Sequence, residues 1–210
     1  MRWLAVLTAA TLLLTGCTER ADVGAPLPEQ SSATTATSGP APSASALAAQ
    51  KKRAGIADCP ASVADAAPVA RGLPDVVLPC LGGGRPVRLA GLRGPPMIIN
   101  VWAQWCGPCR EEAPYLAQVA ARKPKGVRIL GVDFVDTQPG LAIEFAQLSR
   151  WAYPQLADPD KVLAAPLQIT GPPVTLFVRP DGTIAGRHSG PFTSAEQIRT
   201  LARRHLGVTM

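Results

Sequence analysis

The sequence predicts an α/β fold in which helices flank a mixed β-sheet. The apolar run at residues 97–102 is typical of a central strand that is covered on both faces. A helical pattern follows at residues 107–122, and a last helix begins at a capping box over residues 193–196 and ends before Gly207. Strands that alternate with helices in this way indicate a sheet between helical layers.

The segment ahead of the central strand predicts a short β-hairpin. Residues 75–78 and 86–89 are extended in character, and three glycines at 82–84 lie between them. After the helix at 107–122, residues 127–132 form a second apolar run in the sequence. We therefore expect a hairpin first, and then strand, helix and strand in succession.

The C-terminal half predicts a second helix and a second hairpin. Residues 141–150 have helical periodicity, and a shorter element is expected near residues 162–163. The run at 174–178 predicts a strand, Asp181-Gly182 a turn, and residues 183–187 the returning strand. These two strands complete the predicted mixed sheet.

The N-terminus has the character of a targeting segment. One positive charge at Arg2 precedes an apolar stretch at residues 4–14. This stretch is shorter than the ~20 residues of a spanning helix and fits the apolar region of a signal peptide. Residues 14–17, Leu-Thr-Gly-Cys, resemble a bacterial lipobox. We expect a signal peptide at 1–16 and a lipidated Cys17; the alternative is an ordinary secretory signal with an incidental cysteine.

A tether is predicted between this cysteine and the folded domain. Residues 18–54 are rich in Ala, Ser, Thr, Pro and Gly, with almost no large apolar side chains. Such a segment cannot bury enough apolar surface to offset the entropy of ordering its backbone. We expect residues 17–54 to be a flexible tether and residues 55–210 to form the domain, held at the extracytoplasmic face of a bacterial membrane.

The distribution of charge along the chain does not predict nucleic-acid binding. The formal net charge of +6 comes from 21 basic and 15 acidic residues. The basic residues are scattered and do not form a helix face interleaved with aromatic side chains. A weak attraction to anionic membranes or acidic partners remains open.

Two of the five cysteines form a Cys-x-x-Cys motif at the start of a predicted helix. Unpaired backbone N–H groups and the helix dipole stabilise a thiolate at the first position, Cys106. Cys109 lies one turn further on, where it can attack a mixed disulfide formed by Cys106. The motif predicts a redox-active pair, with no cofactor and no metal. A zinc site would need further ligands, and the chain has only His188 and His205. A purely structural disulfide is the other alternative.

The residues around this pair resemble a known superfamily. The segment 101–110, Val-Trp-Ala-Gln-Trp-Cys-Gly-Pro-Cys-Arg, is similar to thioredoxins, and residues 109–114 resemble the TlpA/ResA-like branch of membrane-tethered disulfide oxidoreductases. The resemblance covers residues 72–206 and implies a thioredoxin-like fold. That branch carries an added N-terminal hairpin, which matches residues 75–89.

The resemblance also implies roles for residues in and around the Cys106–Cys109 pair. Cys106 would be the exposed nucleophile and Cys109 the buried resolving thiol. Pro173 matches the cis-proline beside which these proteins accept a substrate chain, although the doubled Pro172-Pro173 leaves open which proline is cis. Trp105 is expected to flank the exposed sulfur.

Glu112 is a candidate proton relay. Asn100 stands where thioredoxins carry a buried aspartate, and an amide cannot titrate. Glu112 matches an acidic residue of the ResA-like branch, so the resemblance implies that it serves Cys109. The alternative is that Glu112 is a solvated helix residue.

Cys59 and Cys80 are the two cysteines that neither the lipobox nor the Cys-x-x-Cys motif includes. An extracytoplasmic location makes a disulfide between them plausible, and closing a loop of 21 residues would contribute ~3 kcal/mol. The sequence predicts a structural disulfide here, and a pair of thiols with its own redox role is the alternative.

The expected reaction is dithiol–disulfide exchange with exported proteins. Gly107-Pro108 between the cysteines resembles reducing thioredoxins, which favours a reductase fed by a membrane electron donor, with apocytochrome c thiols as one substrate class. A disulfide-forming oxidase is the first alternative. A copper-binding lipoprotein of the same fold is the second.

Overall fold

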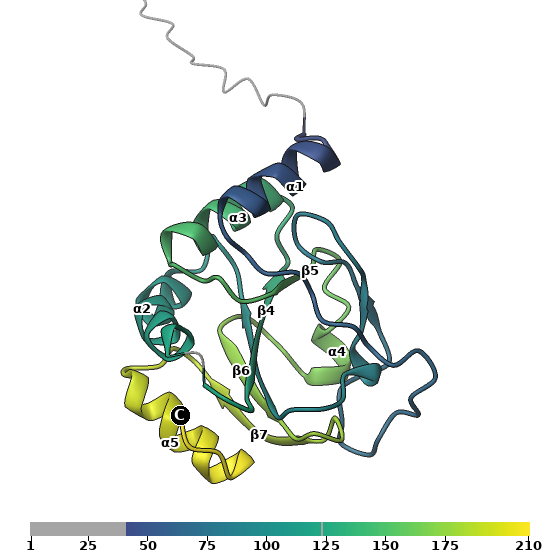
Figure 1. The fold of residues 1–210 in the computed structure, drawn as a ribbon, viewed down its shortest axis with the longest axis vertical. Coiled ribbons are helices and arrows are strands. Elements are labelled where there is room, and N and C mark those ends of the chain that lie inside the picture. The colour runs from purple at the N-terminus through teal and green to yellow at the C-terminus, as the bar shows by residue number, and fades with distance from the viewer. Residues whose placement is uncertain (1–40, 123) are drawn as a thin grey trace, which may run out of the picture. The chain divides into compact units, whose positions relative to one another are not determined.

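The computed structural model of the chain describes residues 41–122 and 124–210 (Figure 1). The predicted signal peptide at 1–16, the predicted lipidation site Cys17 and the tether up to residue 40 lie outside the described residues.

A five-stranded mixed sheet forms the centre of the fold. Its strands lie in the order β5-β4-β3-β6-β7, with β3 parallel to β4, β4 parallel to β5, and both β6 and β7 antiparallel to their neighbours. The strands are β3 (Met97–Trp102), β4 (Arg128–Phe134), β5 (Gln155–Asp158), β6 (Val174–Val178) and β7 (Ile184–Ser189). All six residues of β3 are buried, which confirms the predicted central strand.

The strand β5 is the one element of the sheet that the sequence analysis missed. Its residues, Gln-Leu-Ala-Asp, include no β-branched or aromatic side chain, so their intrinsic strand preference is weak. Pairing with β4 fixes the segment as a strand instead. Tertiary pairing therefore overrides local preference at this edge.

Helices cover one face of the sheet, and the hairpin with a short helix covers the other. The helices are α1 (Ala44–Arg53), α2 (Gly107–Ala121), α3 (Pro139–Leu148), α4 (Ala164–Leu167) and α5 (Ala195–Leu206). Ile98 and Trp102 of β3 belong to the core cluster that contains the buried residues of α2, α3 and α5. Met97, Ile99 and Val101 point the other way, toward the hairpin and α4. In Figure 1, α2 and α5 lie at the left and α4 at the right.

The predicted N-terminal hairpin is confirmed, although its strands are short. β1 (Val77–Leu78) pairs antiparallel with β2 (Val87–Arg88), and a 3₁₀ turn, η1 (Leu89–Gly91), follows. Leu78 and Val87 are buried in the second core cluster. The hairpin therefore closes the face of the sheet opposite α2.

The structure contradicts the predicted tether in its last third. Residues 44–53 form α1, which packs beside α3 (Figure 1). Ser43 caps this helix by accepting a hydrogen bond from the Ala46 N–H at 3.2 Å. Leu47 packs against the core, and Gln50 donates to the Gly140 carbonyl at 2.9 Å. The alanines that suggested disorder also favour a helix, and a few tertiary contacts suffice to stabilise it.

Gly82 permits this close approach of α1. Its φ of +72° is unfavourable for other residues, and a Cβ there would lie 2.8 Å from the Cβ of Lys51. Gly82 of the hairpin therefore forms part of the surface on which α1 packs.

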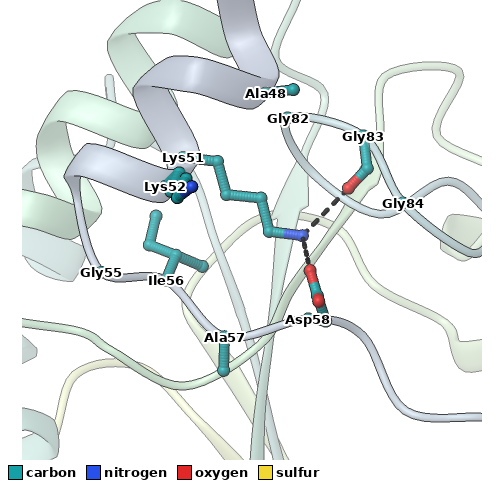
Figure 2. A pocket seen from close by; sticks show the side chains of 10 residues that line it. All are labelled: Ala48, Lys51, Lys52, Gly55, Ile56, Ala57, Asp58, Gly82, Gly83 and Gly84. Carbon is teal, nitrogen blue, oxygen red and sulfur yellow. Dashed lines mark hydrogen bonds and ion pairs between the residues drawn. The ribbon is translucent and has the colours of Figure 1, made fainter.

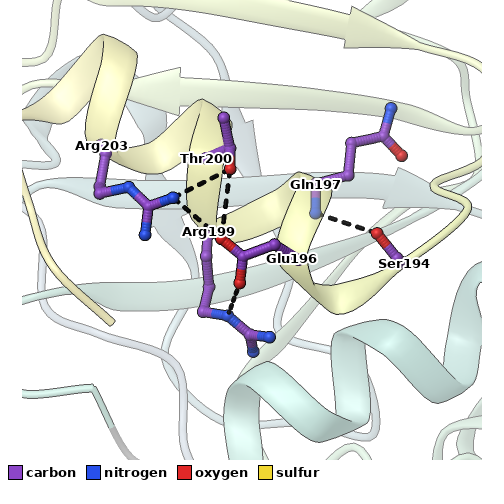
Figure 3. A network of polar contacts seen from close by, with 6 residues as sticks. All are labelled: Ser194, Glu196, Gln197, Arg199, Thr200 and Arg203. Atoms are coloured by element: carbon purple, nitrogen blue, oxygen red, sulfur yellow. Dashed lines mark hydrogen bonds and ion pairs between the residues drawn. The ribbon is translucent and has the colours of Figure 1, made fainter.

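The last helix begins one residue later than its predicted capping box. Ser194, not Thr193, is the N-cap, and its Oγ accepts from the Gln197 N–H at 3.1 Å (Figure 3). Gln197 accepts in return from the Thr193 N–H at 2.9 Å. Arg199 and Arg203 both donate to Glu196 in the first turn and lower its pKa to about 2. Gly207 ends the helix in the left-handed conformation, as predicted.

Candidate active site

Cys106 and Cys109 lie where the central strand ends and α2 begins. They form a disulfide with a Cα–Cα distance of 5.3 Å. Cys106 is the N-cap of α2, and its Sγ accepts a hydrogen bond from the Cys109 N–H at 3.1 Å. This N–H has no partner within the helix, and it lies at the positive end of the helix dipole. The same bond would stabilise a Cys106 thiolate after reduction.

Cys106 is less exposed than the sequence analysis expected. It is 3% exposed, against 0% for Cys109, so the difference between the two is small. The loop before β6 covers the sulfur, with the Pro172 carbonyl oxygen 3.6 Å from Cys106 Sγ. The Pro172–Pro173 peptide bond is cis, which makes Pro173 the cis-proline. Both prolines therefore lie in the loop that borders the reactive pair.

Trp105 provides an exposed apolar surface next to this pair. Its side chain is 53% exposed, and its Nε1–H donates to the Val135 carbonyl at 3.1 Å. Val135 is itself 36% exposed. The loops after β3 and β4 are thus joined, and they leave the side chains of Trp105, which adjoins Cys106, and Val135 exposed.

Glu112 lies three residues after Cys109 on α2, and it is completely buried. Its Oε1 accepts from Asn100 Nδ2 at 2.9 Å, and its Oε2 accepts from the Phe192 N–H at 3.0 Å. A solvated helix position for Glu112 is therefore wrong. Residues three apart on a helix share a face, so Glu112 lies on the side of α2 that carries the buried sulfur.

Burial raises the pKa of Glu112 to about 7, against the opposing effect of the hydrogen bonds from Phe192 and Asn100. Tyr153 is a neighbour of this carboxyl: burial first, and then the Glu112 charge, raise the pKa of the Tyr153 phenol well above its usual value. A carboxyl with a pKa near 7 can both accept and return a proton at neutral pH.

Asn100 is the residue that sequence reasoning undervalued. It stands in the middle of β3 with 0% exposure, and its Nδ2 also donates to Thr175 Oγ1 at 3.1 Å. From the sequence, only the inability of this amide to titrate was evident. A polar residue inside a buried strand needs a partner, and that requirement was the available signal.

A pair of buried carboxyls near the end of β4 was not predicted. Asp133, at the end of β4, is 1% exposed, and Asp136 is 5% exposed. Burial, the charge of Asp136 and a hydrogen bond with Asp136 raise the pKa of Asp133 to about 8. Their burial and proximity therefore favour the neutral form of the Asp133 carboxyl.

Cys59 and Cys80 form a second disulfide, with a Cα–Cα distance of 5.9 Å. It joins the segment after α1 to the end of the hairpin strand β1, and both cysteines are buried. Cys80 also lines a cavity of about 530 Å³ whose wall includes Asp133 and Asp136.

Residues 41–122 and 124–210 contain neither a helix that could span a membrane nor a group of side chains that could hold a metal ion. No helix in this part of the chain is long and apolar enough to cross a membrane. Within the same ranges, no three His, Cys, Asp or Glu side chains gather as a group that could hold a metal ion.

Comparison with known proteins gives a family and named relatives. Residues 69–187 match the AhpC/TSA family. The thiol:disulfide interchange protein DsbE of Allochromatium vinosum is 34% identical over 122 residues, which cover 55% of this chain and 65% of that protein. The thiol:disulfide interchange protein HelX of Rhodobacter capsulatus is 38% identical over 122 residues, which cover 57% of this chain and 67% of that protein. The chain thus matches about two thirds of the length of these relatives.

A solved structure is also similar to this chain. A secreted disulfide oxidoreductase of Mycobacterium tuberculosis, homologous to DsbE of E. coli, is 30% identical with a TM-score of 0.52. The similarity covers 62% of this chain and 93% of that one.

Proposed function

The chain belongs to the AhpC/TSA family, and from this premise we propose that it is a thiol–disulfide oxidoreductase that exchanges disulfides with other proteins. The predicted resemblance to thioredoxin-like disulfide oxidoreductases is confirmed by the family match and by the relatives. The observation that carries the proposal is the Cys106–Cys109 disulfide at the N-terminus of α2, with the Cys109 N–H on Cys106 Sγ.

The reaction proceeds through a mixed disulfide on Cys106. In the reducing direction, the Cys106 thiolate attacks one sulfur of a target disulfide, and the other target sulfur leaves as a thiolate. Cys109 then loses its proton and attacks Cys106 Sγ, which releases the first target sulfur. The target gains two electrons, and the pair Cys106–Cys109 is oxidised to a disulfide.

Glu112 is the proton relay for Cys109 in this proposal. Its support is the complete burial of the carboxyl, its place one turn after Cys109, and the pKa of about 7 that burial produces. Asn100 and the Phe192 N–H are positioning groups, because each holds one carboxylate oxygen in place. Asn100 therefore occupies the position of a titrating residue without titrating itself.

Trp105 and the Pro172-Pro173 loop form the substrate-binding surface. The Pro172 carbonyl lies 3.6 Å from the covered sulfur of Cys106, and the exposed indole of the adjacent Trp105 is hydrogen-bonded to Val135. An extended target segment that carries an apolar side chain next to its cysteine fits this surface. Its backbone would approach the loop before β6, as the family resemblance implies.

The setting that we propose is the extracytoplasmic face of a bacterial membrane, where Cys17 carries the lipid anchor. The substrates are the thiols and disulfides of exported proteins, with apocytochrome c as one class. A membrane partner exchanges electrons with the Cys106–Cys109 pair. The names of the relatives, thiol:disulfide interchange proteins, support the exchange reaction itself.

The reduction potential of the Cys106–Cys109 pair tests the direction. We expect a value near thioredoxin's ~−270 mV, because Gly107-Pro108 resembles the reducing proteins. The measurement equilibrates the full chain in dithiothreitol buffers and reads the alkylation of Cys106 and Cys109 by peptide mass spectrometry. A value near ~−120 mV would contradict the reductase and assign a disulfide-forming oxidase instead.

A further inference from the structure

We propose that Cys59–Cys80 is a second exchangeable disulfide, in which the Lys51 ammonium stabilises Cys80 as the leaving thiolate. This inference concerns a site separate from the Cys106–Cys109 pair, so each can fail without the other.

The contact between Lys51 and Cys80 is the observation behind it. Lys51 is 5% exposed, which is unusual for a lysine, and its Nζ lies 3.2 Å from Cys80 Sγ. Nζ also donates to the Gly83 carbonyl at 2.9 Å and to Asp58 Oδ1 at 3.1 Å (Figure 2). An ammonium group has three donors, and here two of them reach oxygen atoms while the third faces sulfur.

The third donor favours the reduced form of the disulfide. A disulfide sulfur is a weak acceptor, so this N–H of a buried cation is poorly satisfied while Cys59 and Cys80 are joined. A Cys80 thiolate at the same place would accept a charge-assisted hydrogen bond and pair with the cation. Because the interaction is stronger after reduction than before it, Lys51 shifts the equilibrium toward the dithiol.

The charges around Cys80 leave Lys51 as its main electrostatic partner. Asp58 competes for the ammonium, but its side chain is 94% exposed and therefore screened by water. Asp133 and Asp136 line the same cavity as Cys80, and burial together with the Asp136 charge raises the pKa of Asp133 to about 8. Lys52 is exposed on the next position of α1 and has no contact with Cys80 among the described hydrogen bonds.

The exchange step follows from these positions. The thiolate of a partner dithiol attacks Cys59 Sγ, because Cys59 is the more exposed residue of the pair, at 9% against 4% for Cys80. The Cys59–Cys80 bond breaks, and Cys80 leaves as a thiolate beside Lys51. The second thiol of the partner then displaces Cys59, so that the partner is oxidised to a disulfide and this pair gains two electrons. Of the two protons that the partner loses, one is taken up by Cys59 and the other passes to solvent, because Cys80 remains a thiolate paired with Lys51. A low-pKa leaving thiol accelerates such a step.

The test titrates both disulfides of the full chain in one experiment. The protein is equilibrated in dithiothreitol buffers, and the alkylation of Cys59 and Cys80 is read separately from that of Cys106 and Cys109 by peptide mass spectrometry. We expect Cys59 and Cys80 to become alkylated while circular dichroism shows a folded protein. The pH midpoint of Cys80 alkylation should lie below the ~8.5 of a free cysteine.

Substitutions then distinguish the effect of the Lys51 ammonium on Cys80 from any effect of changing helix α1. Lys51→Met keeps the length and apolar stem of the side chain, and we expect it to raise the Cys80 midpoint by at least about one pH unit and to reduce the equilibrium constant for reduction about tenfold. Lys52→Met on the same helix is the matched control and should change neither quantity. Asp58→Asn leaves α1 intact and removes the competing carboxylate, so it should lower the Cys80 midpoint further.

Two results would overturn the proposal. One is that Cys59 and Cys80 become alkylated only when the protein unfolds, which would make the disulfide purely structural. The other is that Lys51→Met and Lys52→Met give the same Cys80 midpoint. If Lys51→Met does not fold, an unchanged Cys80 midpoint in Asp58→Asn together with a wild-type midpoint at or above ~8.5 has the same consequence.

Discussion

Replacing Cys109 with serine should leave the protein covalently attached to its targets. Cys106 can still attack a target disulfide, because its thiolate depends on the Cys109 backbone N–H and not on the Cys109 side chain. The hydroxyl that replaces the Cys109 thiol cannot displace the target, so the mixed disulfide on Cys106 accumulates. Non-reducing electrophoresis of full-length Cys109→Ser with a disulfide-containing protein such as insulin, followed by mass spectrometry, measures this product.

Cys106→Ser is the control for this experiment, and it should give no mixed disulfide. The opposite pattern, in which Cys106→Ser forms the adduct and Cys109→Ser does not, would show that the roles of the two thiols are reversed. The small difference in exposure between the two cysteines makes this a real test.

Glu112→Gln should slow disulfide exchange by about 10²-fold or more, the usual contribution of a positioned acid or base. The carboxylate form accepts the proton of Cys109, and its pKa of about 7 places this change inside the accessible pH range. The wild-type rate of the second thiol step should therefore rise through an inflection near pH 7, and the variant should lack that inflection. Stopped-flow measurement of the exchange rate between pH 5 and pH 9 records both effects.

The same substitution should alter how stability depends on pH. The folded-state pKa of Glu112 is raised above the ordinary 4.5, so its contribution to stability is fully present below pH 4.5 and is lost as the pH rises through about 7. Glu112→Gln should remove this loss and flatten the wild-type decline over that range. A merely structural role for Glu112 would change stability without changing the pH inflection of the rate.

Glu111→Gln is the matched control, since Glu111 is the preceding residue of α2 and is exposed. It should retain the wild-type rate and the inflection. If Glu112→Gln also retained both, Glu112 would have no part in the proton transfer.

The fold was predictable where the sequence carries a strong local pattern. The run at 97–102 became β3 with the same bounds, because a buried central strand needs apolar residues on both faces. The strand at 174–178 likewise became β6. In contrast, β5 depends on its pairing with β4, and α1 depends on its contacts with α3. The local sequence of neither segment predicts these tertiary contacts.

The site was predictable to the extent that its chemistry lies in one motif. Cys106, Cys109 and Trp105 are neighbours in the sequence, so their grouping needs no tertiary information. The bond between Asn100 and Glu112, and the contact between Lys51 and Cys80, join residues from different elements. Only the packing of α2 on β3, and of α1 on the hairpin glycines, brings those pairs together.

Reduction of a protein disulfide by the full chain tests the central claim most directly. Insulin is mixed with dithiothreitol, and the rate of its reduction is measured with wild type, with Cys106→Ser and without added protein. The account predicts that wild type accelerates the reaction and that Cys106→Ser gives the rate of dithiothreitol alone. Equal rates with and without wild type, or full acceleration by Cys106→Ser, would contradict the assignment of Cys106–Cys109 as the exchanging pair.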